Sequence, residues 1–277
     1  MAMIIDVHTH IFPPEVVDNR ELFLQGEPAF AAIYNDPKAP MATAESLLSA
    51  MDNEKVDQAW ALGFPWVKEA NARLHNEYLA SVVKKHPQRF RGLGCVHPVA
   101  AWAQVEAARC LDMGLHGLGE IAFYSTDLNI KALGPLCELC ALADKPLLLH
   151  TNEPVGHRYP GKAPMTLASL YGLIKSHPRT KLVLAHMAGG LFFYALLKKE
   201  MSTTLRNVWI DTAAAPFLYE PKAYALAVEL MGSEKVLLGS DYPLLSVSRY
   251  SKELAEAGLS QSDLEAVMGE NAARLIA

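Results

Sequence analysis

Short apolar segments recur along the chain, and each is followed by a longer segment in which apolar and polar residues alternate with helical spacing. Eight of the short segments have the length and composition of buried strands: Met3 to Val7, Val56 to Leu62, Phe90 to Val96, Gly117 to Ala122, Pro146 to Leu149, Lys181 to Ala185, Asn207 to Asp211 and Lys235 to Gly239. Strands that alternate with helices pair in parallel through right-handed crossovers. The pattern therefore predicts an α/β fold.

The amphipathic segments carry signals for helix ends. Thr43-Ala-Glu-Ser46 is a capping sequence before a helix that contains Leu47 and Met51. The other predicted helices are Trp66 to His86, Ala101 to Met113, Ile130 to Ala143, Met165 to His177, Leu191 to Met201, Pro221 to Met231 and two at the end of the chain, one of them additional to the eight units.

Eight β-α units in 277 residues fit a closed (β/α)8 TIM barrel, whose catalytic groups stand at the C-terminal ends of the strands. An open doubly wound sheet is the alternative, but the sequence has no glycine-rich phosphate turn after its first strand. Two long connections, Ile11 to Pro40 after the first strand and Asn152 to Pro164 after the fifth, are expected to form loops at the rim. No linker divides the chain, so we expect one domain over residues 1–277.

Composition excludes several classes of protein. With 25 Lys and Arg against 30 Asp and Glu, the chain has no basic surface of the kind that nucleic acid requires. No apolar run approaches the roughly 18 to 20 residues that span a bilayer, and the first residues lack a basic secretory start. We expect a cytoplasmic protein that binds neither nucleic acid nor membrane. Its four cysteines are too few for a disulfide framework, and Cys137 and Cys140 are expected on one buried helix face.

Side chains that bind metal ions stand where the predicted strands end. The first strand ends in Asp6-Val-His-Thr-His10, and because side chains alternate in a strand, both histidines point to one side. Six such groups occur at the ends of five strands: His8, His10, Glu120, His150, His186 and Asp241. Each of them alone is explained by packing, but their joint position at one rim predicts a metal centre.

The other histidines have simpler explanations. His86 and His177 precede proline at helix ends, where a partly positive imidazole suits the helix dipole. His75 and His116 are explained by packing or solvent. His97 ends the third strand before Pro98, which makes it a weaker candidate for the rim.

These motifs resemble those of the amidohydrolase superfamily of metal-dependent barrels. The resemblance rests on four motifs along essentially the whole chain: Asp6-Val-His-Thr-His10, His150, Leu184-Ala-His-Met-Ala-Gly-Gly190 and Gly239-Ser-Asp-Tyr-Pro243. The sequence is most similar to the amidohydrolase 2 branch, which contains hydrolases as well as decarboxylases of the aminocarboxymuconate semialdehyde and resorcylate type.

The resemblance implies a divalent metal ion, with zinc as the expected ion and one or two ions per chain. It makes first ligands of His8, His10, His150 and Asp241. His186 would bind a second ion, or orient the attacking water or the substrate.

The fourth strand departs from the pattern of many hydrolases of this superfamily. They carry a carboxylated lysine there, whereas this chain has Glu120. Glu120 resembles the bridging glutamate of TatD-like members. Turned inward, it would favour a binuclear site; turned away, it would leave a mononuclear one.

The main functional expectation is a metal-dependent hydrolase, which would use a metal-activated water on an amide, ester or lactone-type bond of a small molecule. Asp241 would accept the proton and pass it to the leaving group, and His186 would hydrogen-bond the polarised oxygen. One alternative keeps the same ligands in a non-oxidative decarboxylase of a small carboxylic acid. A second alternative is a catalytically inactive metal-binding barrel.

Side chains beyond the strand ends complete the prediction. His157, Arg158 and Lys162, in the loop after strand five, are candidates for binding an acidic substrate. Aromatic residues of the rim segments are candidates for a pocket wall: Phe12, Phe30, Tyr34, Trp66, Tyr124 and Tyr159. Tyr242 is expected to pack so that it holds Asp241, and the apolar terminal helices are a candidate interface for a homodimer.

Overall fold

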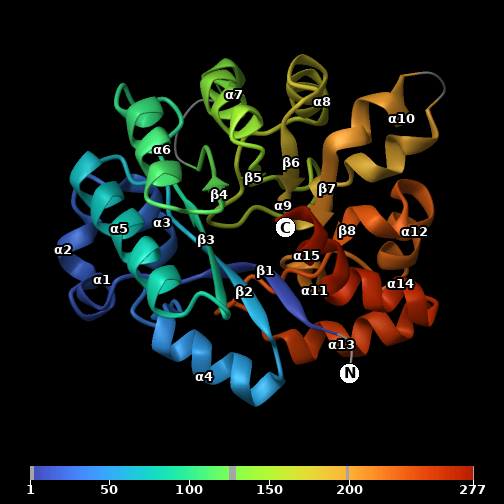
Figure 1. Ribbon diagram of the computed structural model, residues 1–277, viewed down its shortest axis with the longest axis horizontal. Coiled ribbons are helices and arrows are strands. Elements are labelled where there is room, and N and C mark those ends of the chain that lie inside the picture. Colours follow the sequence, from blue (N-terminus) through green and yellow to red (C-terminus); the bar gives the residue numbers. More distant parts are fainter. Residues whose placement is uncertain (1–2, 125–128, 198–199, 277) are drawn as a thin grey trace.

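The computed structural model describes residues 3–124, 129–197 and 200–276, and it confirms the predicted TIM barrel. Eight parallel strands follow one another in chain order (Figure 1). Their bounds are β1 Ile5–His10, β2 Gln58–Leu62, β3 Phe90–Gly94, β4 Gly117–Ile121, β5 Pro146–Leu149, β6 Lys181–Leu184, β7 Val208–Asp211 and β8 Val236–Leu237. The backbone N–H of Val7 donates to Leu238 O at 2.8 Å, and Thr9 pairs with Tyr242, so the last segment returns to the first strand.

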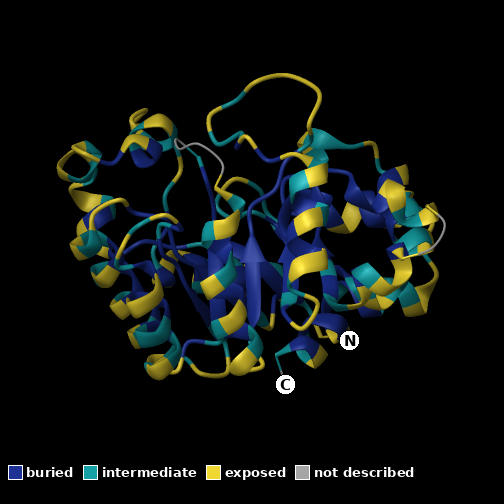
Figure 2. Ribbon diagram, turned by 90° about the horizontal axis from the view of Figure 1, so that it is seen from above, coloured by how far each residue is buried: buried dark blue, intermediate teal, exposed yellow. Residues whose placement is uncertain are grey.

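Helices surround the strands and present their outer faces to solvent, while the strands are buried (Figure 2). The longer helices are α4 Ala44–Glu54, α5 Glu69–Lys85, α6 Ala103–Asp112, α7 Gly134–Leu142, α8 Leu167–Ser176, α12 Lys222–Met231 and α13 Val247–Glu256. Thr43 caps α4 by accepting a hydrogen bond from the backbone N–H of Ser46, as the sequence predicts. Thr166 caps α8 in the same way from Ser169.

Shorter helices lie in the connections and at the end of the chain. They are α1 Pro14–Asp18, α2 Arg20–Leu24, α3 Pro28–Tyr34, α9 Ala185–Ala188, α10 Met201–Thr204, α11 Ala215–Leu218, α14 Gln261–Glu265 and α15 Asn271–Leu275. The 3-10 helices are η1 Ile130–Leu133, η2 Leu191–Leu196, η3 Leu205–Asn207 and η4 Ser233–Lys235, and η5 Ala266–Glu270 is a π-helix. No helix of the described ranges is long and apolar enough to cross a membrane.

The structure corrects the predicted helix from Leu191 to Met201. Residues 198–199 of that range lie outside the described residues, and the rest holds the 3-10 helix η2 and the first residue of the short helix α10. The run from Leu191 to Leu197 is almost continuously apolar and lacks a polar face, so it does not specify an amphipathic helix. Leu196 is 76% exposed, which shows that this run does not bury one continuous helical face.

The first long connection is more structured than a loop, because it holds α1, α2 and α3. These helices pack with the segment after β2 into a separate apolar cluster that includes Phe12, Phe30 and Trp66. A second cluster fills the barrel interior with side chains such as Val7, Trp60 and Leu148. Helix α15 packs on this interior through Ala272 and Leu275, and Figure 1 shows it across the middle of the ring of strands.

Candidate active site

The six predicted side chains converge at the C-terminal ends of the strands. His8 and His10 extend from β1, Glu120 from β4, and His150, His186 and Asp241 from the segments that follow β5, β6 and β8. Two sets of three, which share Glu120, have ligand atoms within 4.8 Å of one another: His8, His10 and Glu120, and Glu120, His150 and His186. Asp241 joins the first set, because its Oδ1 lies 3.4 Å from His10 Nε2 and 3.6 Å from His8 Nε2.

Glu120 is turned into this cluster. Its Oε1 accepts a hydrogen bond from His150 Nδ1 at 2.9 Å, and its Oε2 lies 3.6 Å from His10 Nε2. Tyr124 donates its hydroxyl to Oε2 at 3.0 Å, and its ring packs edge-on against His150. Burial alone would raise the pKa of Glu120, but the nearby His150 and His8 hold this pKa well below its ordinary range.

The cluster is buried and rich in carboxylates. Side-chain exposure is 0% for His8 and 2% for Glu120, whereas His10 and Asp241 reach 13% and 15% and form the accessible side. Burial alone would lower the pKa of His8, but the carboxylates of Asp211 and Glu120 outweigh it and raise this pKa to about 10. His8 is therefore held in an environment that demands positive charge.

Hydrogen bonds outside the cluster fix which ring nitrogens face into it. His8 Nδ1 donates to Asp211 Oδ2 at 2.9 Å, and His186 Nδ1 donates to Ala213 O at 3.0 Å. In the neutral form of each ring, which a metal ligand must have, the lone pair is then on Nε2 and points inward. His8 Nε2 lies 3.2 Å from His10 Nε2, so the two nitrogens face the same space, where a shared hydrogen or a cation would satisfy both.

The donor set fits a divalent metal ion. Imidazole nitrogens and carboxylate oxygens converge within one buried space, and such mixed nitrogen and oxygen donors suit ions from manganese to zinc. Within the described ranges, His150 Nε2 is also buried without a hydrogen-bond partner. The imidazoles can balance the negative charge of the carboxylates only by binding protons. A metal ion would balance this charge with the imidazoles neutral.

Two carboxylates that the prediction does not include form hydrogen bonds to the segments that carry the cluster. Asp6 accepts hydrogen bonds from the backbone N–H groups of Ser240 at 2.9 Å and His8 at 3.2 Å, and from the Ser240 hydroxyl. Asp211 contacts both His8 and the turn that carries His186. Asp211 ends the seventh strand, so the same strand-end criterion that found the other residues could have found it.

His186 begins a turn of left-handed backbone. Its φ is 55°, and Met187 and Ala188 follow with 56° and 52° before Gly189 and Gly190. A Cβ on Gly189 would lie 2.3 Å from the carbonyl oxygen of Asn152, so only glycine fits there. Non-glycine residues in this region cost about 1 kcal/mol or more each, and such strain concentrates at functional sites.

The three predicted substrate-binding side chains lie in the loop after β5, two of them exposed and one bonded within the loop. His157 and Arg158 are exposed in the loop after β5. Lys162 is committed within that loop, because its Nζ pairs with Glu153 Oε1 at 2.7 Å and also donates to backbone carbonyls. Among the described residues, no hydrogen bond or ion pair joins these three side chains to the cluster.

Most of the predicted aromatic wall packs against itself. The rings of Phe30 and Trp66 are 4.6 Å apart, and Phe12 and Tyr34 meet edge-on at 5.2 Å. Tyr159 donates to Glu153 at 2.9 Å within its own loop, so Tyr124 is the member of this set that bonds to the cluster in the described part of the chain.

Tyr242 contributes through its backbone. Its carbonyl oxygen accepts a hydrogen bond from the backbone N–H of His10 at 2.7 Å. This bond ties the Asp241 segment to β1.

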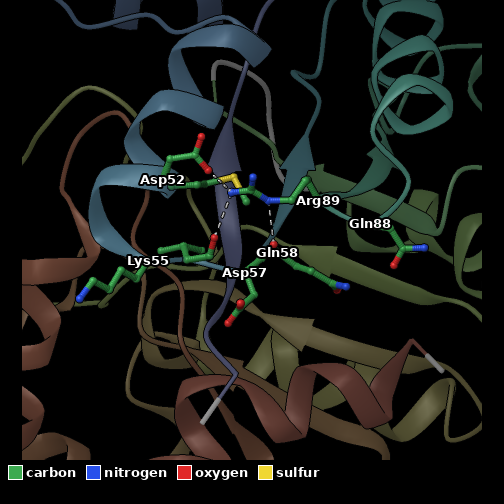
Figure 3. A pocket seen from close by; sticks show the side chains of 8 residues that line it. Asp52, Lys55, Asp57, Gln58, Gln88 and Arg89 are labelled. Atoms are coloured by element: carbon green, nitrogen blue, oxygen red, sulfur yellow. Dashed lines mark hydrogen bonds and ion pairs between the residues drawn. The ribbon is translucent and has the colours of Figure 1, made fainter. Parts of the chain in front are cut away.

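Two hollows lie elsewhere, one beside α4 and the other beside α15. One, of about 510 Å³, is lined by Asp52, Lys55 and Arg89 among others (Figure 3). Arg89 pairs with Asp52 at 2.7 Å and donates to the carbonyl oxygens of Val56 and Asp57, so its charge is satisfied. The other, of about 220 Å³, adjoins Trp209 and Asn271. Both lie away from the cluster, at the N-terminal ends of the strands.

Known proteins resemble the whole chain. A 2-amino-3-carboxymuconate-6-semialdehyde decarboxylase of Dictyostelium discoideum is 24% identical, with 97% of this chain and 90% of that protein covered. The crystal structure of a 5-carboxyvanillate decarboxylase from Sphingomonas paucimobilis superposes with a TM-score of 0.78 at 22% identity, covering 100% and 99% of the two chains. A dihydroxybenzoic acid decarboxylase from Polaromonas, with bound manganese and 2-nitroresorcinol, superposes at 0.76 with 19% identity, covering 100% and 97%.

These relatives correct the main functional expectation. The prediction of a hydrolase is wrong, because the three relatives above, each matched along nearly the whole chain, are decarboxylases. The physical reason for the error is that one set of metal ligands serves both reactions, so the ligands alone do not choose between them.

The family follows from the match along the sequence. A family model with the description "Amidohydrolase" matches residues 5–277, from the first residue of β1 to the end of the chain. The barrel, the strand-end histidines and this match agree, and the chain belongs to the amidohydrolase family.

Proposed function

We propose that this protein is a metal-dependent, non-oxidative decarboxylase of a small unsaturated carboxylic acid with a polar substituent beside the carboxylate. The buried cluster of imidazoles and carboxylates is the observation that carries the proposal, in a chain whose full-length relatives are decarboxylases. The polar substituent is inferred from the compounds that the names of those relatives contain: a 2-amino-3-carboxymuconate-6-semialdehyde, a 5-carboxyvanillate and a dihydroxybenzoic acid.

The metal ligands would be the six residues of the cluster, with His8, His10, His150 and Asp241 as the first set. When bound, the ion would supply positive charge for the carboxylate and the neighbouring oxygen of the substrate. Zinc remains our prediction for this chain, although the Polaromonas relative holds manganese. Elemental analysis of the purified protein tests it, and manganese as the main ion would contradict it.

The number of ions is a separate proposal. Glu120 faces inward and belongs to both sets of three ligands, so it would be available to each of two ions. Two ions per chain in the elemental analysis would support this arrangement. One ion per chain, unchanged in Glu120→Gln, would contradict it.

Asp241 and His186 would move and hold protons during the reaction. Decarboxylation breaks a carbon–carbon bond and leaves its electron pair on the substrate carbon, which must then receive a proton. Asp241 is at the accessible side of the cluster, and its pKa is held low because His10, His8 and His186 outweigh the effect of burial. It would take a proton from the substituent of the substrate and give it to that carbon. His186 would hydrogen-bond the substrate carboxylate and orient it.

Arg158 and His157 would bind the acidic substrate from the exposed loop after β5, and Lys162 would hold that loop by its pair with Glu153. A homodimer also remains a prediction. Light scattering on the purified chain tests it.

The decisive experiment is a panel of dihydroxybenzoic acids, 5-carboxyvanillate and 2-amino-3-carboxymuconate-6-semialdehyde, with carbon dioxide release as the measurement. We expect release from at least one acid, and a loss of more than 100-fold in Asp241→Asn, in line with the typical contribution of general acid–base catalysis. Asp52→Asn, at the opposite end of the barrel, is the matched control and should keep full activity. No release from any acid by the metal-loaded protein would overturn the proposal.

A further inference from the structure

Asp211 is a fully buried carboxylate at the end of β7 that links two strands of the cluster. Its side chain has 0% exposure. Oδ2 accepts from His8 Nδ1 at 2.9 Å, and Oδ1 accepts from the backbone N–H groups of His186 at 2.9 Å and Ala213 at 3.0 Å. It lies at the Nδ1 side of His8, whereas the Nε2 side of that ring faces the other ligands. It therefore contacts the ring of His8 and the backbone of His186, and it belongs to neither set of three ligands.

The bond to His8 determines where that ring carries its hydrogen. An ionised carboxylate only accepts hydrogen bonds, so Nδ1 must be the protonated nitrogen of a neutral His8. The lone pair is then on Nε2, which lies 3.2 Å from His10 Nε2 and 3.7 Å from Glu120 Oε1. A metal ion needs this lone pair, and the second nitrogen of a metal-binding histidine is ordinarily fixed by such a partner.

The bonds to the backbone secure the left-handed turn. Oδ1 holds the N–H of His186, the first residue of the turn, and also the N–H of Ala213. The carbonyl oxygen of Ala213 in turn accepts from His186 Nδ1 at 3.0 Å. Asp211 thus fixes both the backbone of His186 and the residue that orients its ring.

We propose that Asp211 is a positioning residue which sets the tautomer of His8 and anchors the turn that carries His186. The inference rests on the proposed function, because it assigns His8 to a metal ion and His186 to the substrate. It extends that function by making β7 a required part of the centre.

The isosteric variant Asp211→Asn isolates the first role. The asparagine oxygen can still accept from His186 and Ala213, but its NH₂ group would face His8 Nδ1. His8 must then accept at Nδ1 and carry its hydrogen on Nε2, which blocks metal binding. We expect the affinity of the metal-free protein for Mn²⁺ to fall 10- to 100-fold, as for other partners of metal-bound histidines. The visible spectrum of the Co²⁺ protein should also change.

Two controls separate positioning from folding. Glu253→Gln removes another buried carboxylate, whose partners among the described residues are Tyr224 and Arg249 and not the cluster, and should leave the Mn²⁺ affinity unchanged. Thermal unfolding of each metal-free variant shows whether the sample is folded at the temperature of the titration. A folded Asp211→Asn protein with wild-type Mn²⁺ affinity and an unchanged Co²⁺ spectrum would overturn the proposal.

The variant His8→Ala tests whether Asp211 acts through His8. If it does, adding Asp211→Asn to His8→Ala should lower the Mn²⁺ affinity by less than about twofold, because the two changes remove the same interaction. A further loss as large as in the wild-type background would overturn the tautomer role. Metal binding is measured without substrate, so a wild-type protein that binds Mn²⁺ but releases no carbon dioxide would refute the proposed reaction and leave the role of Asp211 standing.

Discussion

The two ends of the barrel are built on different principles, although the same eight strands supply both. At the C-terminal end, imidazoles and carboxylates are buried together, and His186, Met187, Ala188 and Asp241 have positive φ. At the N-terminal end, Arg89 is paired and hydrogen-bonded, and α15 closes the interior with apolar side chains. Buried charge and most of the non-glycine residues with positive φ therefore gather where the chemistry is proposed, although Lys55 and Asp144 also have positive φ just before β2 and β5. Apolar packing at the other end stabilises the fold that holds the cluster.

Removal of a ligand at the C-terminal end should give the largest effect. We expect His8→Ala to lower carbon dioxide release about 10³-fold, because a metal ion contributes several kcal/mol of charge stabilisation. The unfolding free energy of the metal-free variant, measured in urea, should equal or exceed that of the metal-free wild type, because the substitution removes one ionisable side chain from a crowded charged site. A marked loss of stability in the metal-free variant would contradict the contrast between the two ends.

His75 is an exception to the contrast, because it stabilises the functional end. It accepts from Trp66 Nε1 at 3.0 Å and donates from Nε2 to Ile11 O at 2.7 Å, and burial lowers its pKa to about 4. The folded state therefore binds this proton less readily than the unfolded chain, whose histidine titrates near pH 6.5. The stabilisation is complete above pH 6.5 and declines toward pH 4, by about 3 kcal/mol in all.

The variant His75→Gln measures this term. The difference between the unfolding free energies of wild type and variant, taken from urea titrations at several pH values, should shrink as the pH falls from 6.5 to 4. A difference that does not change with pH would show that folding does not lower the pKa of His75.

Leu275→Ala tests the N-terminal end. Leu275 is 5% exposed and packs on the barrel interior from α15, so truncation should cost about 2 kcal/mol of unfolding free energy, at the lower end for buried leucines. The kcat per folded molecule should remain that of the wild type. A fall in kcat without a fall in stability would show that the two ends are coupled.

The smallest expected effect is at the exposed loop after β5. Arg158→Ala should raise the KM for an acidic substrate about fivefold and leave kcat unchanged, because an exposed ion pair contributes about 1 kcal/mol or less. The exposed Arg179, which pairs with Glu138 on the outer surface, offers the control Arg179→Ala. Equal KM values for both variants would remove Arg158 from substrate binding.

The sequence predicts the strands well, since a buried parallel strand is a short apolar run between polar ends. Pro146–Leu149 matches β5 residue for residue. The prediction of a helix from Leu191 to Met201 is wrong because the left-handed turn before it determines how the chain continues. That turn depends on contacts with Asp211 and Asn152, which are distant in the sequence.

The candidate site is foreseeable only in part. Strand ends identify which side chains can meet, because the topology brings those ends together. Lys162 shows the limit: a long side chain in a loop has many partners within reach, and Glu153 takes it. The metal ligands do not predict the reaction either, because hydrolysis and decarboxylation use the same donor atoms.

The bond between β1 and the segment after β8 has a consequence for synthesis. Asp6 and its partner Ser240 are 234 residues apart, so at 5 to 20 residues per second the first strand waits on the order of 10 to 50 s for the segment that completes it. During this interval His8 and His10 are on the nascent chain without Asp241. The centre can be assembled only after β8 has left the ribosome, which makes the loading of any metal ion a step that follows translation of the barrel.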